Sequence, residues 1–355
     1  MPIDNNIEAI LQETVLQAIA SNTTLNIKAG GSKDFYGHAT AGQILNIADH
    51  QGIINYEPSE LVITARAGTS IKAIQTILAE QQQMLAFEPP TFADQATLGG
   101  TLACNFSGPR RAYTGAVRDY VLGCKIINGQ AQLLSFGGQV MKNVAGYDVS
   151  RLMAGSMGTL GIILEASLKV IPQPEAEITL VQELKFATAL SKLQQWNTLP
   201  LPISASFFYH DKLYIRLSGA TATLAVAQQN MGGELLQQAE TFWQSITEQN
   251  HAFFNAKQTL WRLSLAANTA ELALAGDTLY EWGGALRWLQ SDEPEALIRE
   301  LCRAVNGHAT LFRTSAKHIN IFQPLPPHLL KLHQQIKQAF DPHAIFNIGR
   351  MYPEL

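Results

Sequence analysis

The residues best suited to chemistry in this sequence are glycines, hydroxyls and amides gathered in three short clusters. The clusters occupy residues 29–33, 97–108 and 155–161. Glycine has no Cβ, so it permits positive φ and lets the backbone approach another body closely. Turns rich in backbone N–H groups attract anions. The clusters therefore predict a site wrapped around a phosphate-bearing ligand. The alternative is a loop-rich domain that needs glycine only for its turns.

The first cluster has the form of a phosphate cradle. A short predicted strand, 25–28, runs directly into Gly30, Gly31, Ser32 and Lys33. The glycines allow N–H groups to converge, and the hydroxyl and ammonium add donors. The spacing of a Walker A loop is missing, so a P-loop is excluded. A simple turn between two strands is the competing interpretation.

Positive charge follows the second cluster. Arg110, Arg111 and Arg118 lie within nine residues of one another. Arginine favours bidentate contact with phosphate or carboxylate. The alternative for each is a solvated surface charge, and Asp119 is placed to pair with one of them.

Composition limits the possible classes of protein. The chain has 355 residues, of which 46% are hydrophobic and 15% charged, with a formal net charge of −4. This length predicts two or three domains with ample core. The net charge gives no support for nucleic-acid binding. The low charge fraction is compatible with a subunit that covers part of its surface with partners.

The cysteines and apolar runs suggest a location. The three cysteines, Cys104, Cys124 and Cys302, form no CxxC pair. This count argues against a secreted disulfide framework and against an iron–sulfur cluster held by this chain alone. The sequence shows no signal peptide and no run of the ~20 apolar residues that span a bilayer. We expect a cytoplasmic protein, with any membrane contact made indirectly, and no metal site.

Hydrophobic periodicity predicts the elements that must position the clusters. Apolar spacing of three and four predicts helices over 5–20 and after Ser70, and β-branched runs predict strands over 60–68 and 162–170. Asn128 and Gly129 predict a hairpin turn. Pro172 and Pro174 break the last of these strands, and we place a domain boundary there.

The second half of the chain has another pattern. Strands and helices are predicted in the order strand, helix, strand, strand, helix over residues 178–231. This order is typical of a ferredoxin-like sandwich, an antiparallel sheet covered on one face by helices. Further elements extend it to residue 313. A proline-rich connection at 324–327 then leads to a helix over 329–340. No internal repeat is visible in the sequence.

Several motifs in order carry a family resemblance. Residues 25–172 resemble the FAD-binding domain of the vanillyl-alcohol oxidase and p-cresol methylhydroxylase type. No single motif is specific, but their order and spacing are. The motifs are Ala29–Lys33, Pro89-Pro90, Thr97–Gly100, Asn105–Gly108, Arg118-Asp119 and Gly158–Gly161.

Further motifs narrow the resemblance. Across nearly the full length the chain is similar to the smaller FAD-binding subunit of bacterial glycolate oxidases. The segments that carry this similarity are Ser107–Arg111, Lys142–Asp148, Leu260–Ser264, Trp282–Leu289 and Phe346–Tyr352.

The resemblance implies an α+β fold and a flavin lodged between two domains. The FAD-binding domain would be two-lobed and span 1–174. A ferredoxin-like cap would span 175–322, and a C-terminal segment, 323–355, would pack back on the FAD domain. Gly30, Gly31, Ser32, Gly99 and Gly100 would hold the diphosphate. Thr97, Asn105, Ser107 and Gly108 would line the ribityl and isoalloxazine side, and Gly161 and Ile162 the adenine or flavin edge. Lys33, Pro89 and Arg118 complete the implied set of cofactor-binding residues.

The resemblance also implies a reaction and partners. The assembly would contain a larger FAD-binding subunit and an iron–sulfur subunit, oxidise glycolate to glyoxylate, and pass electrons to a membrane acceptor. Two other interpretations stay open. In the first, the chain is a non-catalytic subunit that serves assembly or electron relay. In the second, it is a stand-alone FAD-dependent oxidase of another 2-hydroxy acid.

Two departures from the family pattern affect the chemistry. The first cluster offers Ser32 and Lys33 where relatives with covalent flavin carry histidine, so we expect non-covalent FAD. The histidine-rich motif of hydroxy-acid oxidising relatives is absent. We interpret His308 and His318 as ordinary structural or surface residues, and the catalytic base stays unassigned. Arg262, Arg287 and Arg313 are candidate cations for a substrate carboxylate, and the alternative is that they pair with local carboxylates. We interpret Cys104 as a small buried residue without a redox role.

Overall fold

The computed structural model describes residues 4–138, 148–255, 257–314 and 320–355. Contacts divide the chain into two compact units. The first unit comprises Met1–Phe106, Ala116–Pro172 and Pro324–Leu355, and the second comprises Ser107–Gly115 and Gln173–Gln323. The segment Ser107–Gly115, which lies within the predicted FAD-binding range 1–174, groups with the second unit. Within the described ranges, no helix combines the length and apolar character needed to cross a bilayer.

A five-stranded antiparallel sheet forms the core of the first unit. Its order is β3-β4-β8-β6-β7. The strands are β3 (Ile53–Glu57), β4 (Val62–Arg66), β8 (Ile162–Lys169), β6 (Val121–Ile127) and β7 (Leu133–Gly137). The central strand β8 is mostly buried on both faces, which explains its near-continuous apolar run. Asn128 connects β6 and β7, as predicted, by accepting bonds from the N–H groups of Gln130 and Gln132.

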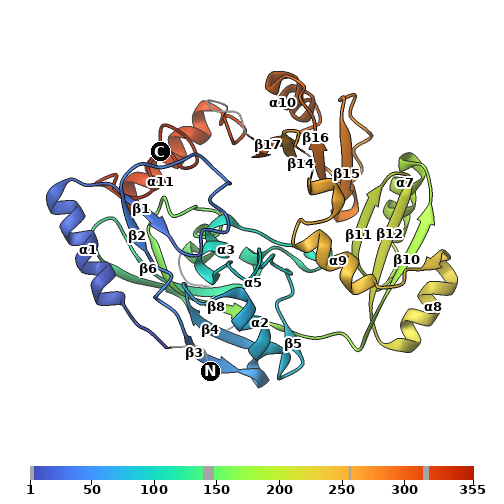
Figure 1. Cartoon of the computed structure of the whole chain (residues 1–355), viewed down its shortest axis with the longest axis horizontal. Helices are drawn as coiled ribbons and strands as arrows, with labels where there is room; N and C mark the ends of the chain where they lie inside the picture. The colour runs from blue at the N-terminus through green and yellow to red at the C-terminus, as the bar shows by residue number, and fades with distance from the viewer. Residues whose placement is uncertain (1–3, 139–147, 256, 315–319) are drawn as a thin grey trace. The chain divides into compact units, whose positions relative to one another are not determined.

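Helices and two small two-stranded sheets surround this core (Figure 1). Strands β1 (Leu25–Lys28) and β2 (Gln43–Asn46) pair in parallel, and β5 (Gln83–Met84) pairs with β9 (Ile171–Pro172). Helix α1 (Glu8–Ser21) buries one apolar stripe, and α2 (Ile71–Ala79) buries another. The Ser70 side chain caps α2 by accepting a bond from the N–H of Ala73 at 3.1 Å.

Short helices position the glycine clusters. Helix α3 (Leu98–Cys104) carries the second cluster, and Thr97 caps it. Helices α5 (Val117–Tyr120) and α6 (Val149–Leu152) follow in the first unit, while α4 (Arg111–Thr114) belongs to the second. The motif residues Lys142–Tyr147 lie outside the described residues.

The C-terminal segment belongs to the first unit. Helix α11 (Pro327–Phe340) is followed by a turn in which Phe346 forms a parallel bridge with Leu25 of β1. Lys337 is buried and donates to the Asp341 carboxylate at 2.7 Å and to the carbonyls of Thr159 and Phe346 at 2.7 and 2.8 Å. These bonds compensate an ammonium that would otherwise be costly to bury.

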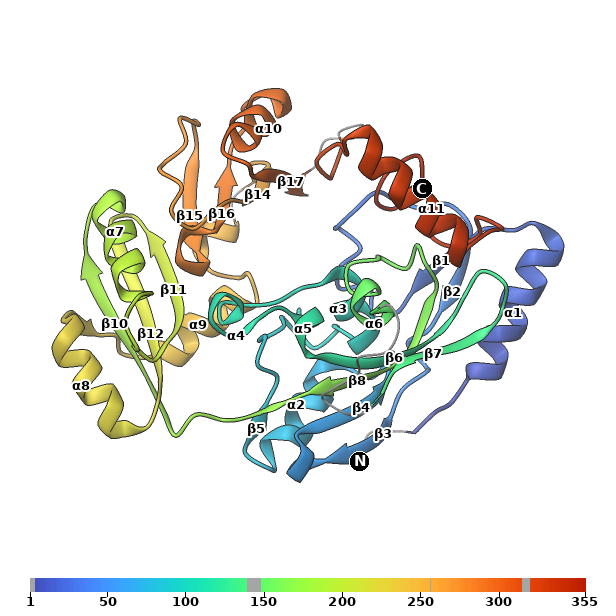
Figure 2. The ribbon, with the colours of Figure 1, turned by 180° about the vertical axis from the view of Figure 1, so that it is seen from behind.

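The second unit is built on one eight-stranded sheet (Figure 2). Its order is β13-β10-β12-β11-β15-β16-β14-β17. The strands are β10 (Ala176–Glu183), β11 (Ile203–Tyr209), β12 (Lys212–Gly219), β13 (Glu234–Leu235), β14 (Leu260–Ser264), β15 (Asp277–Glu281), β16 (Leu286–Gln290) and β17 (His308–Arg313). The helices are α7 (Phe186–Trp196), α8 (Thr221–Met231), α9 (Ala239–Thr247) and α10 (Glu295–Ala304).

This sheet is a topological duplication that the sequence does not reveal. Read from its outer edge inward, each half of the sheet has the order fourth, first, third, second: β13-β10-β12-β11 from one edge and β17-β14-β16-β15 from the other. Each set therefore has the strand order of a ferredoxin-like sheet. The two sets join edge to edge through the antiparallel pair β11 and β15. In the second set an irregular connection between β14 and β15 stands in place of the first helix.

Replacing Lys337 with methionine is expected to destabilise the first unit. The substitution leaves the fully buried Asp341 carboxylate without its cation, which typically costs about 3–5 kcal/mol. Urea unfolding should show this loss. Lys331→Met, on an exposed position of the same helix, is the control and should change stability by less than about 0.5 kcal/mol. Equal effects of the two substitutions would contradict a stabilising role for the buried pair.

Candidate functional site

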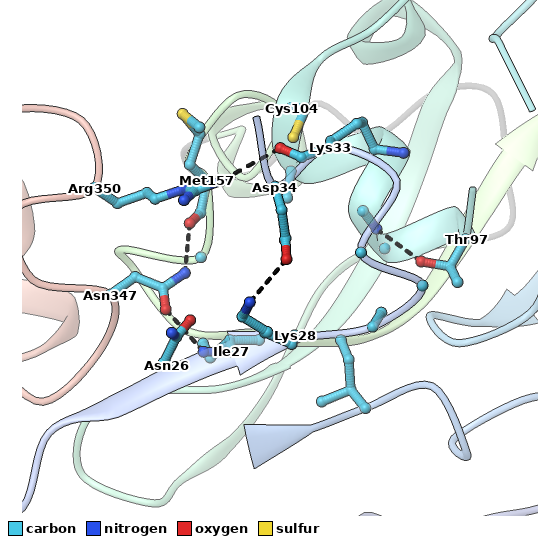
Figure 3. Close-up of a pocket in the computed structure, with 18 of the residues that line it drawn as sticks. Asn26, Ile27, Lys28, Lys33, Asp34, Thr97, Cys104, Met157, Asn347 and Arg350 are labelled. Atoms are coloured by element: carbon cyan, nitrogen blue, oxygen red, sulfur yellow. Dashed lines mark hydrogen bonds and ion pairs between the residues drawn. The ribbon is translucent and has the colours of Figure 1, made fainter. Parts of the chain in front are cut away.

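A cavity of about 220 Å³ opens in the first unit (Figure 3). Segments from distant parts of the sequence line it. The lining residues are 26–34, 39–40 and 47, then Thr97, Gly99, Gly100, Ala103 and Cys104, then Met157, Gly158, Gly161 and Ile163, and finally Asn347 and Arg350. The three glycine clusters at 29–33, 97–108 and 155–161 thus all contribute residues to the lining of one cavity. The sequence predicts that these clusters come together around a ligand.

Unpaired backbone donors mark one side of the cavity. The N–H groups of Gly30, Gly31 and Ser32 find no acceptor anywhere in the described part of the chain. All three residues line the cavity. Gly31 has φ +67°, a conformation that glycine adopts without strain. Consecutive N–H groups without partners form a concavity that suits an anion.

The charges around the cavity favour an anion as well. Lys28 is neutralised by Asp34, with 2.7 Å between Nζ and Oδ2. Lys33 is buried, and its ammonium donates to the Ser32 hydroxyl at 2.9 Å. Arg350 adds a second lining cation. The lining side chains therefore carry three positive charges and one negative charge, which complements a diphosphate.

The two glycines of α3 contribute packing rather than donors. The N–H of Gly99 donates to the Ala67 carbonyl at 2.8 Å, and that of Gly100 donates to the Thr97 hydroxyl at 3.3 Å. A Cβ on Gly99 would lie 2.7 Å from the Cβ of Ala67. Gly99 therefore allows α3 to pack closely on the end of β4. A Cβ on Gly100 would approach the Lys33 side chain at 3.5 Å, so this glycine keeps the cavity open beside the first cluster.

Buried polar atoms without partners lie at the other end of α3. The Thr101 hydroxyl, the Asn105 side-chain oxygen and the Ser156 hydroxyl have no hydrogen-bond partner among the described residues. Thr101 and Asn105 lie one helical turn apart, and Ser156 belongs to the glycine turn that bonds α3 through the carbonyls of Leu102 and Ala103. Buried polar atoms are normally paired, so these three mark a place that suits a polar ligand edge.

Eight of the predicted cofactor-binding residues line the cavity. They are Gly30, Gly31, Ser32, Lys33, Thr97, Gly99, Gly100 and Gly161. The other six do not line it. They are Pro89, Asn105, Ser107, Gly108, Arg118 and Ile162.

The structure shows where these six residues lie instead. Ile162 is fully buried in β8, as its apolar side chain requires, and Pro89 is also buried. Ser107 and Gly108 belong to the second unit. Asn105 ends α3 with its oxygen in the unpaired group described above.

The three predicted arginines are divided between the two units. The Arg118 side chain is 59% exposed and lies 3.8 Å from Asp119, so the surface-charge interpretation holds for it. In the second unit Arg110 pairs with Glu177, and Arg111 stacks on the Trp282 ring at 4.3 Å.

Several other residues line the cavity that the sequence did not predict. They are Asn26, Lys28, Asp34, Thr40, Met157, Asn347 and Arg350. Lys28 and Asp34 flank the first cluster, so proximity alone could have indicated them. Asn347 and Arg350 lie in a motif that the resemblance used, yet nothing in the sequence placed that motif beside residue 30.

The second unit holds the three arginines considered for a substrate carboxylate. Arg287 is 1% exposed and donates to the carbonyls of Thr269, Ala270 and Gly284, so its role is structural. Arg313 donates to the Gln249 side chain at 2.7 Å. Arg262 is half-buried on β14 and its guanidinium stacks on the Trp282 ring at 5.3 Å, and this guanidinium makes no hydrogen bond within the described ranges.

His308 lies close to Arg262 on the neighbouring strand β17. It pairs with Ser264, and Thr310 of β17 pairs with Arg262. Desolvation and, to a lesser extent, the charge of Arg262 lower the pKa of His308. His318 lies outside the described residues. Desolvation also raises the pKa of the Cys104 thiol in the cavity wall, so this thiol is protonated at neutral pH.

Comparison with known proteins identifies the family of this chain. Residues 7–137 match the family model described as FAD binding domain. Over 345 residues the sequence is 46% identical to the glycolate oxidase subunit GlcE of Escherichia coli K12, and the match covers 97% of each chain. The chain belongs to the GlcE family.

Other relatives share parts of the sequence or the fold. GlcD, a glycolate oxidase subunit of Bacillus subtilis, is 35% identical over 40% of this chain and 30% of its own length. A D-lactate dehydrogenase of Anaerostipes hadrus is 34% identical over 39% of this chain and 29% of its own. Alkyldihydroxyacetonephosphate synthase superposes with a TM-score of 0.68 at 15% identity, covering 95% of this chain and 74% of that one. These findings confirm the family, the α+β FAD-binding fold, the oxidoreductase class and FAD as the cofactor.

The two glycines of α3 should respond differently to valine. Gly100→Val places a branched side chain against Lys33 and Thr97, so FAD retention is expected to fall at least tenfold while the fold persists. Gly99→Val drives α3 away from Ala67 and should lower stability by about 1–3 kcal/mol. The flavin-to-protein absorbance ratio and urea unfolding separate these effects. A Gly100 variant with full flavin content would contradict the assignment of this wall.

Lys33 and Arg118 form a second contrast. Lys33→Met removes a buried charge from the cavity, and the loss of a charge-assisted contact, about 1.5–3 kcal/mol, predicts roughly tenfold or more weaker FAD binding. Arg118→Met, at an exposed position of the same unit, should leave the affinity unchanged. Titration of the apo chain with FAD, followed by flavin fluorescence, measures both. A larger effect at Arg118 would restore the arginine cluster and overturn the cavity assignment.

Proposed function

We propose that this chain is the FAD-binding subunit of a multi-subunit enzyme that oxidises glycolate, or a closely related 2-hydroxy acid, to the corresponding 2-oxo acid. The observation that carries the proposal is the row of unpaired N–H groups at Gly30, Gly31 and Ser32 beside the buried Lys33. The full-length match to a glycolate oxidase subunit supports the choice of substrate.

The residues of the first unit fit FAD. The N–H row and Lys33 would hold the diphosphate, because they supply unpaired donors and positive charge together. Thr97 and Gly100 form the facing part of the wall. FAD, when bound, accepts the hydride from the substrate carbon, and the protein orients it and tunes its potential.

We also propose that the flavin is held without a covalent bond. None of the described residues lining the cavity is a histidine or tyrosine. The remaining candidate, Cys104, is kept protonated by desolvation and is therefore a poor nucleophile.

Substrate recognition requires a cation, and Arg262 is the best candidate in the second unit. Its guanidinium has aromatic support from Trp282 and leaves its donors to a ligand. Arg287 and Arg313 already donate to protein acceptors. A carboxylate on Arg262 would form a bidentate pair of the kind that arginine favours.

The proposal includes partner chains. GlcE and GlcD are each named as subunits of glycolate oxidase, which supports an assembly with a larger FAD-binding subunit. We further propose an iron–sulfur subunit that carries electrons to a membrane acceptor, with the complex at the cytoplasmic face and this chain touching the membrane only through its partners.

The visible spectrum of the purified chain tests the proposal. Apo chain should bind FAD and show flavin bands. Bleaching by glycolate with this chain alone would show that it oxidises the substrate itself. Bleaching only after the partner subunits are added would show that it relays electrons. A folded chain that neither contains nor takes up FAD would contradict the proposal.

Arg262→Gln should act on substrate binding. In the assembled enzyme, the loss of one charge-assisted pair is expected to raise KM for glycolate about tenfold or more, with a smaller change in kcat. Arg303→Gln, on an exposed position of α10, is the control and should leave both constants unchanged. An unaltered KM in the Arg262 variant would remove this residue from the substrate site.

A further inference from the structure

The end of the chain forms part of the cavity wall in the first unit. Asn347 and Arg350 both line the cavity, more than 300 residues after the first glycine cluster (Figure 3). The segment is held in place by main-chain pairing with β1. Leu25 donates its N–H to the Ile345 carbonyl at 2.6 Å, and the N–H of Asn347 donates to the Leu25 carbonyl at 3.0 Å.

Asn347 fixes the position of this segment. Its side-chain oxygen accepts a bond from the N–H of Ile27 at 2.8 Å, and its amide donates to the Met157 carbonyl at 2.7 Å. The residue is 5% exposed and has φ +43°, a region in which asparagine is enriched. One buried side chain therefore joins β1, the glycine turn at 155–158 and the C-terminal segment.

Arg350 holds the loop that follows the N–H row. Nη1 donates to the His38 carbonyl at 2.8 Å, and Nη2 donates to the carbonyls of Tyr36 and Lys33 at 2.6 and 3.4 Å. In return, the N–H of His38 donates to the Arg350 carbonyl at 2.9 Å. A planar guanidinium can gather several carbonyls in this way, and a lysine ammonium cannot reproduce its fixed fork.

Arg350 and Lys33 contribute to the cavity in different ways. Both terminal nitrogens of Arg350 already donate to backbone carbonyls of residues 33–38. Lys33, by contrast, lies at the end of the N–H row, next to Ser32. Arg350 therefore acts on the cavity chiefly through the loop that it holds.

We propose that Arg350 is a positioning residue for the diphosphate of the cofactor: it fixes residues 33–38 from the side of their carbonyls, and thereby keeps the N–H row of residues 30–32 and Lys33 arranged for the anion. This inference rests on the proposed function, since it takes the FAD diphosphate as the anion. The C-terminal segment is then a component of the cofactor site, and binding of a diphosphate and ordering of residues 345–350 are coupled.

Titration of the full-length apo chain with FAD and with ADP tests the inference. ADP carries the diphosphate without the flavin. Arg350→Gln and Arg350→Lys are both expected to raise Kd for both ligands at least tenfold, because both lose the three-carbonyl contact. Arg118→Gln, at an exposed position of the first unit, is the matched control and should bind like wild type.

Each outcome has a distinct meaning. If Arg350→Lys binds like wild type while Arg350→Gln does not, charge alone matters and the positioning role is overturned. If both variants bind like wild type, the inference fails and the proposed function stands. If wild type binds neither ligand, the proposed function fails, and the inference with it.

Hydrogen–deuterium exchange of the wild-type chain tests the same coupling if the variants fold poorly. Addition of ADP should slow exchange in residues 30–38 and in residues 345–350 together. Slower exchange in residues 30–38 with no change in residues 345–350 would overturn the coupling.

Discussion

A row of unpaired backbone donors is the constraint on which the first unit depends. The N–H groups of Gly30, Gly31 and Ser32 lack protein acceptors within the described chain, and Gly30 and Gly31 are exposed, so these donors are open to a ligand. A bound anion supplies the missing acceptors. The surrounding residues hold these N–H groups in place without supplying acceptors for them. Lys33 and Arg350 add positive charge, Asn347 ties β1 to the opposite glycine turn, and the buried Lys337 holds the segment that carries Arg350. On the proposed assignment, a diphosphate would meet donors that the fold has already arranged for it.

The glycines of the first unit serve different physical purposes. Gly31 provides a positive φ in the anion-binding loop, whereas Gly99 lets α3 approach Ala67 and has its own N–H already paired. A cluster of glycines therefore indicates close approach of the backbone to something, but it does not say whether that body is a ligand or another part of the chain. In this protein both occur within one cavity wall.

Local signals in the sequence were sufficient to predict many of the helices and strands and eight of the residues that line the cavity. Apolar periodicity predicted α2, the β-branched run predicted β8, and the Asn128-Gly129 turn predicted the β6–β7 hairpin. The three glycine clusters contribute residues to one cavity. Arg118 was misplaced because spacing along a chain does not tell which way a side chain on a short helix points. The role of Arg350 was missed because it depends on a parallel bridge between Leu25 and Phe346, and periodicity carries no information on which strands pair across 321 positions.

The second unit shows the same limit at the level of topology. Its elements were predicted as a ferredoxin-like sandwich with extensions, but the extensions form a second set of strands in the same order, joined through β11 and β15. The repeat lies in connectivity and not in residue identity, because each set packs a different core. Leu180, Leu213 and Leu217 belong to one core, and Leu263, Leu289 and Leu311 to the other. Only backbone pairing reveals the relationship.

An experimental structure of the FAD-loaded chain tests the central claim most directly. The account predicts that oxygens of the diphosphate lie within hydrogen-bond distance, ~2.7–3.2 Å, of the N–H groups of Gly30, Gly31 and Ser32, with the Lys33 ammonium alongside. A diphosphate bound elsewhere, with these three N–H groups still unpaired, would contradict it.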